Sequence, residues 1–179
     1  NDKNGNSYLF ILLYCTNELM NKSESNQQVF SSSKLKLLDS VTINFGTGKK
    51  TLIALSGSIL DYEGDCMVNA ANTGGITGFG LDELVNRRGG NEMKEARRLF
   101  NGIPTGFTRS TESFNHGRVK WVIHAVGPFF RQNGLSKDSI DKKYHQLQNA
   151  YTNSMKEATN LGCKDIALCL LSCFWVKSR

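Results

Sequence analysis

The residue types best suited to chemistry lie between Cys66 and Gly90 of this 179-residue chain. An apolar strand runs into an Asn-Ala-Ala-Asn corner that ends at Asn72, then into a loop with four glycines, and a helix opens at Leu81. Glycines let backbone N–H groups approach a phosphate, and a helix N-terminus adds partial positive charge. The stretch therefore favours a phosphate site, although a loop that only needs positive φ angles would use the same glycines.

Two standard nucleotide-binding motifs fail when they are tested on this chain. A dinucleotide turn needs the spacing G-x-G-x-x-G, and the run that starts at Gly78 has Glu83 in the last position. A Walker-type loop needs Gly-Lys followed by Ser or Thr, whereas Gly48-Lys49 is followed by Lys50. Neither class of nucleotide site is indicated.

Composition and charge limit the function classes further. Apolar residues make up 39% of the chain and charged residues 21%, which provides for a core and excludes disorder throughout. No apolar run reaches the roughly 18 residues of a membrane span. The net charge of +6 favours an anionic partner. Nucleic acid is weakly supported, since no aromatic residues are interleaved with the basic ones.

The five cysteines indicate a reduced, intracellular setting, cytoplasmic or nuclear. They are odd in number, form no CxxC pair and sit mostly in apolar runs, where cysteine is usually a small core residue. The gaps between Cys163, Cys169 and Cys173 do not match a zinc ribbon or knuckle. We expect core cysteines and no metal site.

Strands alternate with helices along the chain, which argues for an α/β protein. Period-two alternation predicts a hairpin from residues 35–45 and 51–55, and apolar runs predict strands at 66–70, 121–126 and 166–171. Helical spacing predicts helices at 81–88, 91–100 and 140–161. The apolar run 8–14 fits a buried strand or a gene-prediction artefact better than a secretory signal, and residues 17–33 resemble a linker.

Two motifs, which follow one another along the chain, resemble those of the macro domain family of ADP-ribose binders. The first is Val68-Asn-Ala-Ala-Asn72 with its glycine-rich run and the pair Leu81-Asp82. The second is Pro104-Thr-Gly106 followed by the strand WVIHAVGP at 121–128. The resemblance covers residues 34–172 and implies a three-layer α/β/α fold with a mixed central sheet. Residues 1–33 are then an N-terminal extension of uncertain order, and 34–179 the macro domain.

The resemblance also implies the roles of individual residues. Asn72 would hydrogen-bond the distal ribose, and Asp82 would position or activate a water, so both are catalytic candidates. Asn offers a donor and an acceptor to sugar hydroxyls, and a carboxylate at a helix start is stabilised as an anion. For Asp82 the alternative is a plain helix-start carboxylate. The expected ligand-binding residues are Ile59 (beside the adenine), Ala71, Asn72, Gly78, Phe79, Gly80, Leu81 and Ser172.

Several positions depart from the family pattern. Ser58 stands where the family has an Asp that recognises adenine, and Glu83 replaces a small residue near the diphosphate. Phe79 replaces a glycine, and its ring would either stack on the ligand or plug the loop. The stretch from Ser172 to Lys177 lacks the second glycine-rich loop, so we expect a domain truncated before that loop and the following helix.

The function expected from these residues is binding of ADP-ribose or of mono-ADP-ribosylated protein, with hydrolysis of the ADP-ribosyl ester bond as an added activity. The alternatives are a non-catalytic reader and a degenerate domain that binds no ligand. No cofactor and no membrane partner are implied, and a monomer is expected. His124, in the middle of an apolar strand, is expected to be a core residue.

Overall fold

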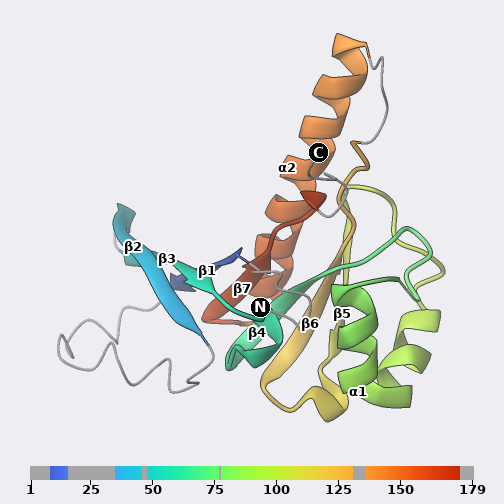
Figure 1. Ribbon diagram of the computed structural model, residues 1–179, viewed down its shortest axis with the longest axis horizontal. Coiled ribbons are helices and arrows are strands. Elements are labelled where there is room, and N and C mark those ends of the chain that lie inside the picture. Colours follow the sequence, from blue (N-terminus) through green and yellow to red (C-terminus); the bar gives the residue numbers. More distant parts are fainter. Residues whose placement is uncertain (1–8, 16–34, 46–47, 77, 131–135, 174–179) are drawn as a thin grey trace.

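The computed structural model describes residues 9–15, 35–45, 48–76, 78–130 and 136–173 (Figure 1). The described strands are β1 (Leu9–Cys15), β2 (Lys36–Phe45), β3 (Gly48–Ser56), β4 (Gly64–Ala70), β5 (Thr108–Glu112), β6 (Val119–Ala125) and β7 (Asp165–Cys169). Within the same ranges the helices are α1 (Leu81–Arg98) and α2 (Lys137–Asn160), and the short 3-10 turns are η2 (Ile59–Asp61) and η3 (Phe114–His116).

The strands form a single mixed sheet in the order β2-β3-β1-β7-β4-β6-β5. β4 runs parallel to β6 and β7, whereas the other neighbours pair antiparallel. α1 packs on β4 and β5, and α2 packs on β5, β6 and β7, while β2 and β3 lie at the end of the sheet away from α1 (Figure 1). This confirms the α/β fold with a mixed central sheet.

The parallel pairing decides where a site can form. Ala70 is paired with Ala125, so β4 and β6 end at the same edge of the sheet. The glycine-rich loop leaves β4 there, and the Gly127-Pro128 turn leaves β6 beside it. In α/β sheets, ligands bind in the crevice outside the carboxyl ends of parallel strands.

The N-terminal strand β1 belongs to the sheet. It pairs with β3 from Leu9↔Ser56 to Cys15↔Lys50 and with β7 on its other side. The sheet thus includes residues that precede the domain boundary expected at residue 34. Of the interpretations offered for the apolar run 8–14, a strand is the one that fits. The linker predicted at 17–33 lies outside the described residues.

Both helices follow local signals in the sequence. α1 is interrupted at Gly90, whose φ of 76° and ψ of −162° are not helical, as expected from the separate helices predicted at 81–88 and 91–100. α2 begins before the predicted residue 140 because the side chain of Ser136 caps it, accepting from the Ser139 N–H at 3.3 Å. Gly162, with φ 71°, lies just after its end.

The sequence pattern missed the edge strand β5. Its residues TRSTE contain no large apolar side chain, so periodicity gives no strand signal. The strand forms because β6 offers a free edge, and antiparallel pairing runs from Thr108↔Ala125 to Glu112↔Trp121.

A buried apolar cluster joins the sheet to both helices, and two of the cysteines belong to it. Cys66 and Cys169 are buried as expected, whereas Cys163 is half-buried and Cys173 exposed. Within the described ranges, no three His, Cys, Asp or Glu side chains are grouped so as to hold a metal ion. No helix of that part of the chain has the length and apolar character to cross a bilayer.

Four basic side chains at the surface are paired with acidic neighbours. Ion pairs join Arg87 to Glu83, Arg98 to Glu95, Arg118 to Glu63 and Lys120 to Asp65. Paired surface charges contribute little field for a polyanion. At these four positions the acidic partner reduces the positive charge that a polyanion would meet.

His116 is expected to make the fold acid-labile. It is buried, neither ring nitrogen has a partner among the described residues, and burial, then Arg88 and Arg118, lowers its pKa to about 4. In the unfolded chain the ring titrates near 6.5, so the unfolded state takes up a proton first. Stability present above pH 6.5 is therefore lost as the pH falls towards 4, by about 2–3 kcal/mol.

Urea unfolding of the parent and of His116→Phe between pH 4.5 and 7.5 measures this effect. The variant should lose less stability over that range than the parent does. His145→Gln, at an exposed site on α2, is the control and should keep the parent's pH dependence. Parallel curves for parent and His116→Phe would contradict the assignment.

Candidate functional site

A pocket of about 520 Å³ opens at the carboxyl ends of β4, β6 and β7. This volume is in the range of small-molecule sites. Five stretches of the chain line the pocket, namely residues 70–73, residues 78–82, Thr105, residues 126–129 and residues 170–172.

Most of the predicted site residues line this pocket together. They are Ala71, Asn72, Gly78, Phe79, Gly80, Leu81, Asp82 and Ser172. Ile59 does not: it is buried in the core cluster and is not part of the pocket lining. Ser58 is also outside the lining and caps η2, where its Oγ accepts from the Leu60 N–H at 3.3 Å. The roles in ligand binding stay predictions.

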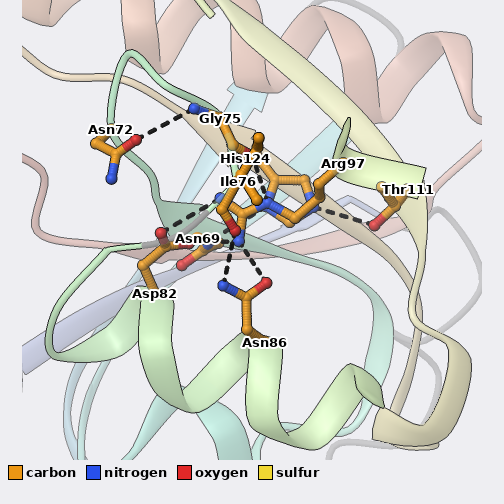
Figure 2. A network of polar contacts seen from close by, with 9 residues as sticks. All are labelled: Asn69, Asn72, Gly75, Ile76, Asp82, Asn86, Arg97, Thr111 and His124. Atoms are coloured by element: carbon orange, nitrogen blue, oxygen red, sulfur yellow. Dashed lines mark hydrogen bonds and ion pairs between the residues drawn. The ribbon is translucent and has the colours of Figure 1, made fainter. Parts of the chain in front are cut away.

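The glycine-rich loop is shaped by short contacts at its start and end. Asn72 Oδ1 accepts from the Gly75 N–H at 3.1 Å, which forms a side-chain turn at the corner after β4 (Figure 2). A Cβ at Gly78 would lie 2.6 Å from Asp82 Oδ2 and 3.2 Å from Asn72 Nδ2, so this approach requires glycine. Gly80 has φ 65°, which glycine adopts without strain.

The first turn of α1 faces the pocket through Leu81 and Asp82. Gly80 is the N-cap and brings no side-chain hydrogen bond to the first N–H groups of the helix. Such groups, with the helix dipole behind them, favour an anion. The geometry of this end of the pocket suits a phosphate group.

The polar centre of the site is a buried ion pair between Asp82 and Arg97 (Figure 2). Arg97 Nη1 lies 2.7 Å from Asp82 Oδ1 and Nη2 lies 3.3 Å from Oδ2, with side-chain exposures of 0% and 1%. Arg97 also donates to the Gly75 carbonyl oxygen and to Asn86 Oδ1, each at 2.7 Å. One guanidinium therefore connects the loop with both halves of α1.

Asn86 adds a second anchor for the same loop. Its Nδ2 donates to the Ile76 carbonyl oxygen at 3.0 Å, while its Oδ1 accepts from Arg97 (Figure 2). Both amide atoms of this buried side chain are thus used. The loop is tied to α1 at two successive carbonyl groups.

A second branch of the network extends from Asp82 to the edge strand β5. Asn69 Nδ2 donates to Asp82 Oδ1 and to His124 Nδ1, the latter at 3.0 Å. Since Nδ1 accepts, the ring proton is on Nε2, which donates to Thr111 Oγ1 at 3.0 Å. Burial and then the charge of Arg97 lower the pKa of His124 well below its usual range. His124 is a neutral core residue, as expected.

Two departures noted in the sequence have definite positions in the structure. Phe79 is 92% exposed at the pocket lining, so its ring does not plug the loop. Glu83 pairs with Arg87 at the surface, at 2.8 Å, and is not part of the pocket lining. The repulsion expected from Glu83 is therefore reduced. Of the stretch 172–177, which stands in place of the second loop, residues 174–177 lie outside the described residues.

Sequence reasoning missed the residues that hold Asp82 in place. Asn69 belongs to the Asn-Ala-Ala-Asn corner, which does not reveal its contact with Asp82, and Asn86, in the second turn of α1, gives no signal beyond its polarity. Arg97 is one of several basic residues in the middle of the chain, and its partner lies 15 positions away. The one usable clue is Gly89-Gly90, a break that allows two helix halves to face each other.

Comparison with known proteins identifies the family. The Macro domain family model matches residues 68–176. A macro domain-containing protein of Caldanaerobacter subterraneus is 36% identical over 123 residues, which cover 66% of each chain. An O-acetyl-ADP-ribose deacetylase of Escherichia fergusonii is 35% identical over 128 residues, covering 69% of this chain and 68% of that one.

A solved structure agrees with these relatives in fold. The macrodomain of Oceanobacillus iheyensis, solved with ADP, has a TM-score of 0.58 at 23% identity and covers 73% of this chain and 66% of its own. The match spans less than two thirds of some curated relatives, for example 60% of one from Cupriavidus necator. The sheet order, the pocket and these matches together show that the chain belongs to the Macro domain family.

Proposed function

We propose that this chain binds ADP-ribose, either free or attached to a protein side chain, and does so as a monomer. The observation that carries the proposal is the pocket at the carboxyl edge of the sheet, where a glycine loop and the start of α1 present N–H groups to an anion. The Oceanobacillus iheyensis macrodomain was solved with ADP, a ligand of the same chemical class.

The proposal predicts that Gly78→Ala weakens ADP-ribose binding about tenfold or more, since the new methyl group would displace the loop from Asp82 and Asn72. Calorimetric titration of ADP-ribose, with AMP and ADP as comparison ligands, measures the affinities. Gly162→Ala is the control, because a Cβ there meets nothing within 4 Å and the site lies after α2. Saturable binding that prefers ADP-ribose supports the proposal. No heat from a parent chain that melts cooperatively would contradict it and favour a degenerate domain.

Ester hydrolysis is the second candidate function, and the deacetylase relative is the observation that favours it. Asp82 is the predicted group for placing water, and it lines the pocket. Its carboxylate oxygens already accept from Arg97 and Asn69, which suits a fixed anion better than a group that must take up a proton. Release of ADP-ribose from O-acetyl-ADP-ribose tests this function. Binding without turnover would leave the non-catalytic reader.

A further inference from the structure

We propose that Arg97 determines the charge specificity of the pocket: by neutralising Asp82 from behind, it allows an anionic ligand such as a diphosphate to occupy a site that has a carboxylate in its wall. The inference rests on the proposed binding function and adds a positioning residue to it. Arg97 does not line the pocket and acts through Asp82.

The carboxylate of Asp82 is an electrostatic obstacle to an anionic ligand. An ionised carboxylate at the pocket wall repels a diphosphate, and the repulsion is strong where water is excluded. Asp82 is 1% exposed, so water screens its charge poorly. The guanidinium of Arg97, at 2.7 Å and 3.3 Å from the two carboxylate oxygens, cancels that charge locally.

None of the other described groups that face Asp82 carries a positive charge that could neutralise its carboxylate. From β4, Asn69 donates to it, and behind Asn69 lies His124 of β6, which is neutral. From α1, Asn86 shares Arg97 with it, and Glu83 is turned to the surface with Arg87. Among the described groups of this network, Arg97 is the cation that balances Asp82.

Removal of the cation should make ligand binding depend on pH. A buried carboxylate without a partner takes up a proton more readily than an exposed one. In Arg97→Met, Asp82 therefore repels the ligand at high pH and ceases to do so once it is protonated. A loop that is merely less well packed would weaken binding without this pH dependence.

The experiment compares the parent, Arg97→Met, the double variant Asp82→Asn/Arg97→Met and Arg98→Met by calorimetry with ADP-ribose from pH 5.5 to 8.0. Arg98 is the matched control, because it is the next residue and pairs with Glu95 at the surface. The double variant lacks the same contact to Gly75 as the single one. The difference between these two variants thus isolates the charge of Asp82.

We expect Arg97→Met to bind roughly tenfold or more weakly than the parent at pH 8 and to recover as the pH falls. The double variant should bind more tightly than Arg97→Met at pH 8 and show no added pH dependence, and Arg98→Met should match the parent within about threefold. If Arg97→Met does not fold, Asp82→Asn alone is compared with the double variant: equal affinities of these two folded variants, of which only the first keeps the positive charge of Arg97, overturn the inference. An equal pH dependence of the ADP-ribose affinity in all four proteins would also overturn the inference. Absence of binding by the parent overturns instead the proposed function.

Discussion

Asp82→Ala is expected to lower the free energy of unfolding by about 3–5 kcal/mol, because it leaves the Arg97 guanidinium buried without its counter-ion. The remaining partners of Arg97, the Gly75 carbonyl and Asn86 Oδ1, are neutral and cannot balance the charge. Urea unfolding followed by circular dichroism measures the loss.

Two further variants make this result interpretable. Glu83→Ala, in the same turn of α1, breaks an exposed pair with Arg87 and should cost less than about 1 kcal/mol. Combining Asp82→Ala with Arg97→Met removes both charges, so the double variant should be more stable than the sum of the single effects by about 2 kcal/mol. A stability of Asp82→Ala equal to that of Glu83→Ala would contradict the buried pair.

The structural role of Asp82 affects how an activity assay is read. Substituting the acidic residue is the natural test for water activation, and a drop in turnover would be taken as a catalytic effect. In this chain the same substitution also loosens the loop through Arg97, which holds the Gly75 carbonyl. Turnover of Asp82→Ala is therefore informative only beside a melting curve of the same sample.

Gly90→Ala is expected to destabilise the fold by about 2–3 kcal/mol and to weaken ligand binding as well. Gly90 has φ 76° and ψ −162°, a region that is essentially restricted to glycine. The break lets the second half of α1 bring Arg97 to Asp82, 15 residues away. In a straight helix those residues would lie about 22 Å apart along the axis.

Gly162→Ala is the matched control for Gly90. It also has positive φ, at 71°, but it lies after α2 and a Cβ there meets nothing within 4 Å. We expect it to cost about 1 kcal/mol and to leave ADP-ribose binding unchanged. Unfolding curves and titrations of both variants separate the cost of backbone conformation from the loss of the Arg97 contact. Equal effects of the two substitutions on binding would contradict a role for the break.

The sequence by itself determined the local elements and the place of the site. Period-two alternation predicted the β2–β3 hairpin, and Gly90 divided the helix that comes after the loop. The Asn-Ala-Ala-Asn corner and the four glycines predicted which loop would line a pocket, and it does. These features depend on backbone preferences and side-chain spacing over a few residues, which a single chain displays directly.

The tertiary structure alone decided which distant groups meet. The apolar run of β1 favours a strand, but only the fold places that strand between β3 and β7. β5 pairs as a polar edge strand because β6 offers it hydrogen bonds, and local propensity does not predict it. Ile59 packs in the core rather than in the pocket lining. The partner of Asp82 is settled by how α1 folds back at Gly90. The spacing of Asp82 and Arg97 along the chain does not predict this ion pair, because the pair forms only when the two halves of α1 are buried together.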